Sequence, residues 1–597
     1  MDGFLLYHDS MTNHQPWHQP LRTHEMLLPF VSWLQKYSLE TLRFDMLAGV
    51  TVAAILTPQA MAYALLAGLP PIVGFYAALV GAIAASLWGH SRKLSTGPVA
   101  IVSFLVFTAL VPFAEPGSAQ YLLLAAALAM LSGLILLLLG LFRLGFIMRV
   151  IPHTVIVGFA TAAEIIIIVT QVPSLLGFSA LHYEFMLPTI ASIATHSVNM
   201  HGPTVILGLA SLGLLIALKR ISRRIPAELL VLVAMTVASF MFDFDARGIA
   251  TVGEVHAVLP SFSFPILSFT DWLVLLNKAW IIALVGFVGT YAIVRSISTR
   301  AKERIDIDQE LVGQGMGNIA AGLFHGFPVS GSFSRTAINV SAGAQTGIAS
   351  VCAAIIVLGA LVLIAPIFSL IPLATLSAIV IIAVAGTIDI GKVRDMYRAS
   401  RTDGIVALLT FAIAFILKPD DAVAIGVIVA LVLFMRKIVW AKIRILGIEP
   451  EWGILQGAGT GTVETFQGVL MLRIETSAFY GNIDYIVRTI DKLITHEESS
   501  GNGIRALVLD CSSVTYIDLS GAETLREYME GLAAEGIDTY GIYMHSAVTE
   551  QLERVGALPY LTIFHNIREM RAALNLPEPS MEAKNVVQSE HERERDS

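Results

Sequence analysis

The sequence predicts an α-helical protein that crosses a membrane many times and carries a small α/β domain in the cytoplasm. Three observations support this fold class. Hydrophobic residues make up 55% of the chain and charged residues only 14%, where a soluble globular protein has about 25% charged residues. Apolar stretches recur from Asp45 to Trp440. Beyond that point the hydrophobic pattern changes to that of alternating strands and helices.

A straight helix needs about 20 residues to cross a bilayer, and the apolar stretches give fourteen predicted segments. Their approximate bounds are 46–67, 71–89, 97–112, 120–141, 152–172, 203–218, 226–242, 272–296, 309–325, 333–345, 348–371, 373–388, 404–417 and 421–440. An even number of segments places both ends of the chain on one side of the membrane.

The distribution of basic residues in the loops supports this count, because Lys and Arg collect in cytoplasmic loops. Fourteen segments put sixteen Lys and Arg in the loops of one side or, for Arg295, at the adjoining end of a segment, and only Arg247 and Lys418 in the loops of the other. A shift by one segment would destroy this pattern. The sequence therefore predicts a multi-pass protein of the cell membrane with cytoplasmic N- and C-termini.

Both ends of the chain differ from the apolar part. The first residues lack the basic start and the cleavage site of a signal peptide, and their histidines are spaced too irregularly to predict a metal site. From Leu446 onward there are 24 acidic and 11 basic residues, so with a total formal charge of −8 the preceding part carries +5. The two cysteines, Cys352 and Cys511, predict neither a disulfide nor metal ligation, and we expect no cofactor.

The acidic C-terminal part has the pattern of a small α/β domain. Residues 468–475, 504–512 and 539–544 are predicted strands, and residues 484–494 and 521–536 are predicted amphipathic helices. The last residues, 575–597, have the composition of a disordered tail.

Two of the fourteen segments, the third and the tenth, are unusually short and begin with clusters of small residues. These clusters read STGPVAIVS (95–103) and SGSFSRTAIN (330–339), and they lie seven segments apart. Interrupted segments at matching positions of two halves indicate an inverted repeat with a binding site between the broken helices. Each helix that begins inside the membrane directs about half a positive charge at the midplane. The pattern predicts an anion site.

Arg335 lies in the first turn of the second short helix. An arginine at the centre of a membrane costs roughly 2.5–3.5 kcal/mol on insertion scales. A bound anion between the two helix ends would be its natural counter-ion. The alternative is that Arg335 reaches a membrane surface or pairs with an acidic residue such as Glu164.

Three motifs resemble the sulfate-permease/SLC26 family of anion transporters. They are LTPQAMAYALLAGLPPIVGFYAA (56–78), STGPVAIVS and IDQELVGQGMGNIAAGLFHGFPVSGSFSRTAIN (307–339). LVLDCSSVTYIDLSGAETL (507–525) resembles the STAS domain that this family carries. The resemblance implies two intertwined seven-segment inverted repeats, a core domain (segments 1–4 and 8–11), a gate domain (5–7 and 12–14) and a homodimer.

With this resemblance, the expected organisation has four parts. They are a cytoplasmic N-terminal tail (1–40), a transmembrane anion transporter domain (41–445), a STAS domain (453–574) and the disordered tail (575–597). The residues that the resemblance implies for anion binding are Gln59, Tyr63, Val99, Ala100, Ser334 and Arg335. Gln59 and Tyr63 are four residues apart and share one helix face, although helix packing is the alternative role for both.

The chain departs from the family pattern in the eighth segment. Many members carry an acidic residue there, whereas GFVGTYAIVR (286–295) has Gly289. Since that carboxylate is the family's usual candidate for H⁺ or Na⁺ coupling, its absence argues against symport by that route. Glu164, within the apolar fifth segment, is a candidate substitute for proton coupling, with pairing to a neighbouring base or water as the alternative.

The STAS-like motif contains Ser520 at a strand-to-helix turn, where related anti-sigma antagonists are phosphorylated. Ser520 is thus a candidate for regulatory phosphorylation, although in transporters the domain more often has an assembly or regulatory role. Asp518 without a partner base is better explained as a helix cap.

The predicted function is secondary active transport of a small inorganic anion, with sulfate as the first candidate. Chloride/bicarbonate exchange, an uncoupled anion conductor and a signalling receptor are the alternatives. No nucleophile–base pair, phosphate loop or metal cluster predicts an enzyme, and the acidic soluble part does not suggest nucleic acid binding. The predicted partners are the anion, membrane lipid and a second copy of the chain.

Overall fold

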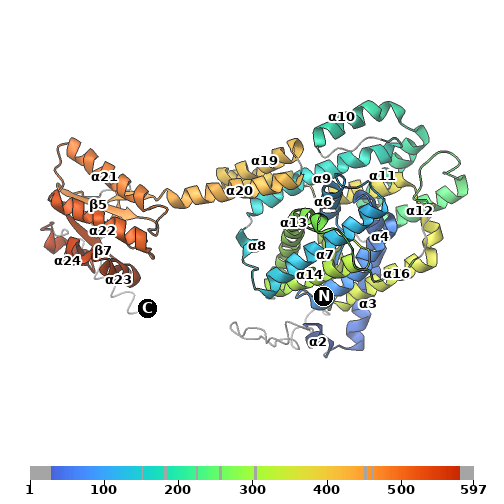
Figure 1. Ribbon diagram of the computed structural model, residues 1–597, viewed down its shortest axis with the longest axis horizontal. Helices are drawn as coiled ribbons and strands as arrows, with labels where there is room; N and C mark the ends of the chain where they lie inside the picture. The colour runs from blue at the N-terminus through green and yellow to red at the C-terminus, as the bar shows by residue number, and fades with distance from the viewer. Residues whose placement is uncertain are drawn as a thin grey trace. The chain divides into compact units, whose positions relative to one another are not determined.

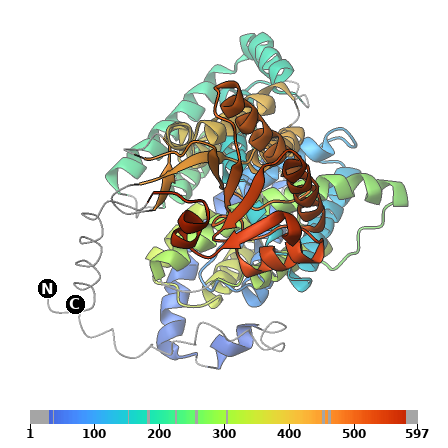
Figure 2. The same cartoon turned by 90° about the vertical axis from the view of Figure 1, so that its left-hand side faces the viewer.

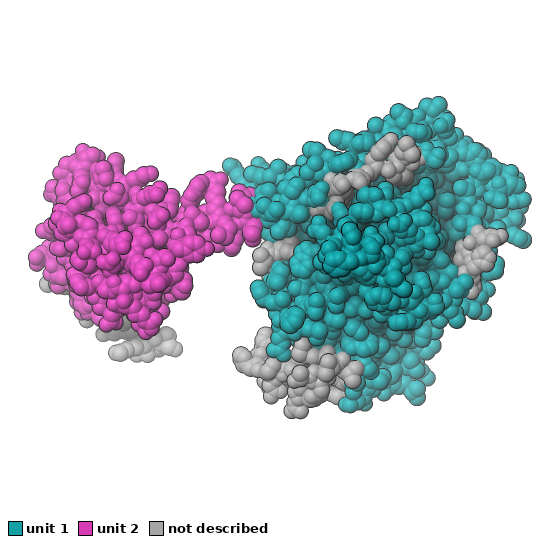
Figure 3. Space-filling view, viewed as in Figure 1, with its two compact units in different colours: residues 1–430 teal, residues 431–597 magenta. Residues whose placement is uncertain are grey.

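The structure is a computed structural model that describes residues 29–35, 37–150, 152–179, 185–222, 226–253, 258–301, 305–417, 419–449, 454–458 and 463–577. Most of the predicted N-terminal tail, including His8, His14, His18 and His24, and most of the predicted disordered tail lie outside these residues. The chain divides into two compact units, residues 1–430 and 431–597 (Figure 3).

The first unit is almost entirely helical (Figure 1). Its elements are α2 (Pro29–Leu34), α3 (Leu39–Leu66), α4 (Pro71–Tyr76), the π-helix η1 (Ala77–Gly81), α5 (Ala82–Trp88), β1 (Thr96–Gly97), α6 (Ala100–Leu110), α7 (Ala119–Leu141), α8 (Ile147–Val150), α9 (His153–Leu176), α10 (Met186–His196), the 3₁₀-helix η2 (Ser197–Asn199), α11 (Gly202–Ile221), α12 (Ala227–Phe242), α13 (Phe269–Ala301), α14 (Ile307–Leu323), β2 (Ser330–Gly331), α15 (Phe333–Ser341), α16 (Ile348–Phe368), α17 (Leu373–Ala385), α18 (Ile390–Ala399), α19 (Arg401–Ile416) and α20 (Pro419–Val439), in which the unit boundary falls.

Every one of the fourteen predicted apolar segments coincides with one of these helices or with a continuous run of them. Eight helical stretches among the described residues are long and apolar enough to cross a membrane, and α6, α12 and α17 are shorter apolar helices. Helix α2 precedes the first predicted segment, and α8, α10, α18 and the 3₁₀-helix η2 lie between predicted segments. The predicted class of a multi-pass helical membrane protein is confirmed.

The helices of this unit pack in two groups. In one group α14 packs against α7 and α5, α7 against α13, and α3 against α16 and α15. In the other, α9 packs against α17 and α19, and α11 against α12 and α17. Helix α6 packs against α3, α7 and α13 of the first group. The first group thus corresponds to predicted segments 1–4 and 8–11, and the second contains segments 5–7, 12 and 13.

Glycines let α7 and α14 approach very closely. A Cβ atom added to Gly133 of α7 would lie 2.5 Å from the backbone nitrogen of Ile319, and one added to Gly315 of α14 would lie 2.6 Å from that of Leu137. Neither position has room for a larger residue. The close contact holds α14 in place beside the two short strands.

The second unit contains a six-stranded sheet with helices on both faces (Figure 2). Its elements after α20 are β3 (Ile443–Ile448), β4 (Leu455–Gly457), β5 (Val469–Ile474), α21 (Ile483–Ser499), β6 (Ala506–Asp510), α22 (Leu519–Ala534), β7 (Asp538–Ile542), α23 (Ser546–Arg554), the 3₁₀-helix η3 (Leu558–Tyr560), β8 (Leu561–Phe564) and α24 (Ile567–Ala573).

The strand order is β4-β3-β5-β6-β7-β8, with β5 to β8 parallel and β3 antiparallel to its neighbours. Apolar side chains of α21, α22 and α23 cover one face, and those of α24 cover the other. The α/β class predicted for this part is confirmed, together with three strands and two helices. The sequence analysis did not predict β3, β4, β8, α23 or α24.

Candidate functional site

Two short helices begin close together in the first unit. Helix α6 has 11 residues and α15 has 9, about half the length that a membrane crossing requires. Each is preceded by a two-residue strand, β1 or β2, instead of another helical turn. These are the third and tenth segments, in which the sequence predicted interrupted helices.

A short antiparallel pairing joins the starts of these two helices. Thr96 pairs with Gly331, and Gly97 pairs with Ser330. Backbone groups that leave the helical pattern inside a membrane protein must find partners within the protein. The backbone groups of the two strands therefore serve as each other's partners, and the pairing fixes the spacing of the two helix ends.

Arg335 lies in the first turn of α15, and none of its surface is exposed. Its Nη1 donates a hydrogen bond to Oε1 of Gln59 at 3.0 Å, whereas Nε and Nη2 have no hydrogen-bond partner in the part of the chain that the structure describes. Nη2 also lies 3.3 Å from the position that a Cβ on Gly97 would occupy. The guanidinium thus spans from α15 to the β1 strand and to α3.

Among the residues that the structure describes, Arg335 forms no ion pair. Its complete burial also excludes the alternative in which the side chain reaches the membrane surface. A buried charge without a partner is strongly unfavourable. The arrangement therefore favours an anion as the missing partner of the guanidinium.

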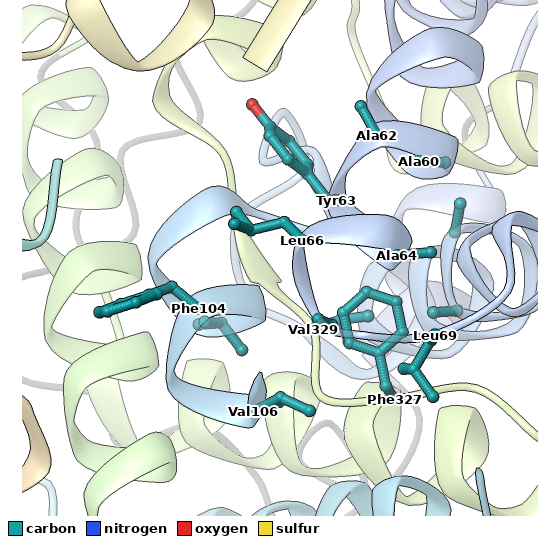
Figure 4. Packing of buried hydrophobic residues seen from close by; sticks show 14 of the residues in the cluster. Ala60, Ala62, Tyr63, Ala64, Leu66, Leu69, Phe104, Val106, Phe327 and Val329 are labelled. Carbon is teal, nitrogen blue, oxygen red and sulfur yellow. The ribbon is translucent and has the colours of Figure 1, made fainter. Parts of the chain in front are cut away.

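Gln59 and Tyr63 lie on one face of α3, as their spacing predicted. Gln59 is 2% exposed and contacts Arg335 directly. Tyr63 is also buried and lies close enough to Arg335 for an electrostatic interaction. Figure 4 shows the Tyr63 hydroxyl turned away from the apolar side chains of Phe327 and Val329.

The other three predicted residues surround the helix ends. Val99 is the N-cap residue of α6, in an extended conformation, and Ala100 begins that helix. No side chain caps the first N–H groups of α6. Ser334 is exposed at the second position of α15, and its Oγ lies 3.4 Å from Oγ of Ser332. Gln59 and Arg335 are thus in direct contact, and Ser334 is not hydrogen-bonded to either.

Threonines that the sequence analysis did not identify support the strand pair. Oγ1 of Thr290 in α13 accepts a hydrogen bond from the Gly331 backbone nitrogen at 2.9 Å. Oγ1 of Thr336 accepts one from the Ser95 backbone nitrogen at 3.0 Å. A small cavity with both polar and apolar lining residues, and with space for about one water molecule, lies between α7, α13, α14 and β2.

Glu164 occupies the middle of α9, is 7% exposed and lies in the other group of helices. Thr387, Lys392 and Asp389 lie near enough to influence its charge. They belong to the connection between α17 and α18 and to α18 itself. Glu164 therefore faces a loop of its own helix group and does not pair with Arg335.

Open space surrounds Gly289 in α13. A Cβ atom added at this position would have no neighbour within 4 Å. The structure thus has room for the acidic side chain that the family pattern often places there.

Ser520 is exposed at the second position of α22. Asp518 caps this helix, because Oδ1 accepts a hydrogen bond from the Gly521 backbone nitrogen at 2.7 Å. Its Oδ2 accepts another from the Tyr480 backbone nitrogen at 3.0 Å. The prediction that Asp518 is a helix cap is confirmed.

Comparisons with known proteins agree with this fold. Residues 42–410 match the sulfate permease family, and residues 462–570 match the STAS domain. The chloroplastic sulfate transporter 4.1 of Arabidopsis thaliana is 32% identical over 519 residues, which cover 84% of this chain and 75% of that protein. A probable sulfate transporter of Mycobacterium tuberculosis is 32% identical over 524 residues, 87% of this chain and 92% of that protein.

Among solved structures, murine Solute Carrier 26 family member A9, an anion transporter in the inward-facing state, has the same fold. The TM-score is 0.83 at 22% sequence identity, and the match covers 97% of each chain.

The fold and the paired short helices define a multi-pass membrane transporter with a C-terminal α/β domain. The chain belongs to the sulfate permease family and carries its STAS domain. It is an anion transporter, and the family consists of transporters rather than enzymes.

Proposed function

We propose that the protein is a secondary active transporter of a small inorganic oxyanion, with sulfate as the first candidate. One observation carries the proposal: Arg335 is fully buried, and its Nε and Nη2 have no hydrogen-bond partner among the described residues. The curated relatives described above are named as sulfate transporters, which supports sulfate in particular.

The chemistry of the guanidinium favours an oxyanion over a halide. Nε and Nη2 form one edge of the guanidinium, and their two N–H groups point in parallel. Two oxygens of one oxyanion can accept both hydrogen bonds at once, whereas a halide offers a single centre. Because Gln59 occupies Nη1, this edge remains available to the anion.

The two helix ends add to the field of Arg335. The N–H groups at the start of α6 have no side-chain cap, and those of α15 begin beside them across the strand pair. Helix N-termini attract anions through these N–H groups and the helix dipole. We assign Gln59, Tyr63, Val99, Ala100, Ser334 and Arg335 to the anion site on this basis.

Transport then follows an alternating-access scheme. The group of helices that contains α3, α6, α14 and α15 is the core domain that carries the anion. The group around α9, α11, α17 and α19 is the gate domain against which it moves. Binding and translocation of the anion, without chemical conversion, are the whole activity.

An exchanger of chloride or bicarbonate is the second candidate, and an uncoupled anion conductor is the third. Gly289 favours them, because this chain lacks the carboxylate that the family resemblance links to H⁺ or Na⁺ coupling. Glu164 is our candidate for proton coupling, because it is a buried carboxylate in the middle of a membrane-spanning helix.

The remaining assignments are parts of the same proposal. The sidedness of the basic loops supports a location in the cell membrane with both termini in the cytoplasm. The family resemblance supports a homodimer, the domain limits 41–445 and 453–574, and a regulatory or assembly role for the STAS domain. Phosphorylation of Ser520 stays a prediction.

The test is uptake by the purified protein in liposomes, with labelled sulfate, bicarbonate and chloride. Each anion is measured with and without imposed pH and Na⁺ gradients. We expect saturable sulfate uptake with counterflow, and we expect Arg335→Ala to abolish it while the protein remains folded. Arg247→Ala, an exposed arginine outside the site, is the control.

Saturable sulfate uptake that Arg335→Ala leaves unchanged would disprove the assigned site. Large currents without counterflow would show that the protein is an anion conductor and not a carrier. Saturable uptake of chloride or bicarbonate alone would replace sulfate as the substrate.

A further inference from the structure

Three polar side chains are spaced four residues apart on α14. Glu310, Gln314 and Asn318 therefore lie on one face of the helix, and each is buried, with at most 2% of its surface exposed. We call these three residues the α14 ladder. Buried polar groups in a membrane protein need specific partners, and the ladder finds them in the two segments that form the strand pair.

Glu310 holds the segment that leads into β1. Its Oε2 accepts hydrogen bonds from the backbone nitrogens of His90 at 3.1 Å and Ser91 at 2.9 Å. Its Oε1 accepts one from Nε2 of Gln314 at 3.1 Å. The His90 imidazole also interacts electrostatically with this carboxylate.

Gln314 and Asn318 hold the two strand segments themselves. Nε2 of Gln314 donates to Oγ1 of Thr96 in β1 at 2.9 Å. Asn318 binds Val329, next to β2, through both backbone groups: Oδ1 accepts from its nitrogen and Nδ2 donates to its oxygen, each at 2.9 Å. Side chains on one face of α14 thus form hydrogen bonds to both the β1 segment and the β2 segment.

We propose that the α14 ladder positions the anion site, with Glu310 as the acceptor that fixes its first segment. This inference rests on the proposed function, because it concerns the same site. The ladder does not touch Arg335 in any of these contacts. It acts through Thr96 and its neighbour Gly97, which borders the free Nη2 of Arg335.

The carboxylate of Glu310 is required for this role. Three N–H donors point at its two oxygens. A glutamine has one acceptor oxygen, and its amide nitrogen would face Nε2 of Gln314, donor against donor. Turning the Gln314 amide would relieve this contact only by giving up the hydrogen bond from Nε2 to Thr96. Glu310→Gln has nearly the same volume, so the packing is kept while the hydrogen-bond pattern is broken.

The experiment measures labelled sulfate uptake by the full-length protein in liposomes at one fixed pH. Half-saturation concentration and maximal rate are determined separately, and thermal stability is measured on the same preparations. The variants are Glu310→Gln, Glu310→Asp and Asn318→Asp. The matched control is Asp308→Asn, which makes the same chemical change on α14 at a carboxylate that accepts from the Gly145 backbone nitrogen instead.

We expect Glu310→Gln and Asn318→Asp to raise the half-saturation concentration about tenfold. The half-saturation concentration of Asp308→Asn should stay within about twofold of that of the unmodified protein. Glu310→Asp keeps both acceptor oxygens, so its half-saturation concentration should lie between those of the unmodified protein and Glu310→Gln. A half-saturation concentration near that of the unmodified protein in both Glu310→Gln and Asn318→Asp would overturn the inference, even if thermal stability falls. Asn318→Asp decides the matter if Glu310→Gln does not fold.

The two proposals fail in different ways. If Arg335→Ala abolishes uptake but the ladder variants bind sulfate normally, only the ladder is refuted. If the unmodified protein shows no saturable uptake of sulfate, bicarbonate or chloride, the proposed function fails, and the ladder inference falls with it.

Discussion

Nη1 of Arg335 donates a hydrogen bond to Oε1 of Gln59 at 3.0 Å, although 276 positions separate the two residues in the chain. This bond ties α15 to α3 and fixes the plane of the guanidinium. It also fixes the amide of Gln59, because Oε1 is committed to Arg335. The free guanidinium edge and the proposed anion position follow from this single contact.

Replacement of Arg335 by lysine tests the positive charge of the side chain separately from its hydrogen-bonding geometry. Lysine keeps the positive charge but cannot form two parallel hydrogen bonds. We expect Arg335→Lys to weaken sulfate binding about tenfold or more, and chloride binding less. Binding titrations of both anions check this, with Arg335→Ala as the variant that loses the charge. Equal weakening of both anions by lysine would contradict the two-point contact.

Gln59→Glu should disable the site more strongly than Gln59→Leu. A carboxylate at this position would pair with Arg335 and supply the counter-charge that we assign to the anion. We expect Gln59→Glu to abolish measurable sulfate uptake. Gln59→Leu should raise the half-saturation concentration by about tenfold, because it removes one hydrogen bond to a charged group. Uptake that survives Gln59→Glu would place the anion elsewhere.

A methyl group on Gly97 should interfere with the anion site. The new Cβ would lie 3.3 Å from Nη2 of Arg335 and 3.6 Å from Cδ1 of Leu56. We expect Gly97→Ala to reduce sulfate affinity several-fold while the protein remains folded. Gly213→Ala, where an added Cβ has no neighbour within 4 Å, is the matched control. Similar sulfate affinities in the two variants would show that the anion does not approach β1.

Glu164→Gln tests proton coupling. If Glu164 carries the proton, the variant should lose the acceleration of sulfate uptake by an imposed pH gradient, whereas uptake without a gradient continues. Uptake in liposomes with and without the gradient measures this. Unchanged proton dependence would remove Glu164 from the coupling mechanism.

In the STAS domain, Cys511 should be unreactive near neutral pH. Burial, with a further contribution from Asp510, raises the pKa of the Cys511 thiol to about 12. The thiolate is the reactive form, so we expect alkylation at pH 8 to be at least about a hundredfold slower in the folded than in the unfolded protein. Mass spectrometry after timed alkylation, in a Cys352→Ala background, measures both rates. Rapid alkylation of the folded protein would contradict the burial of this thiol.

The same thiol contributes to the pH dependence of stability. Its pKa is 9.0 without the protein environment and higher in the folded state, so the folded protein holds this proton more tightly. The contribution is fully present below pH 9 and is lost as the pH rises from about 9 towards 12. We expect Cys511→Ala to flatten the decline of the unfolding free energy in this window.

The sequence predicted the helices of the first unit well because hydrophobic segments long enough for a bilayer are a strong signal. The two interrupted segments were also predictable, since their small residues and short lengths differ from the other twelve. Arg335 could be predicted as a site residue because charged residues are rare within membrane-embedded segments. Each of these signals is local in the chain.

The contacts that shape the site were not predictable from such signals. Thr290, Thr336 and Asn318 bind backbone groups, and Gln314 binds the Thr96 side chain. These partners are 11 to 241 positions away, and no spacing in the sequence predicts such bonds. In the second unit, β3 escaped prediction because it begins only a few residues after the last membrane helix, and β4 because it has only three residues. The pairing of β1 with β2 involves only two residues from each strand.

That pairing restricts how any solute can leave the site. Thr96 and Gly97 pair through their backbones with Gly331 and Ser330, so parting the two helix tips to open a passage would break this pairing. In the proposed transport scheme, the two tips and the guanidinium therefore move together as one cradle. Release then comes from a change in what faces the cradle, and the rate of turnover depends on how easily the surrounding helices slide past it.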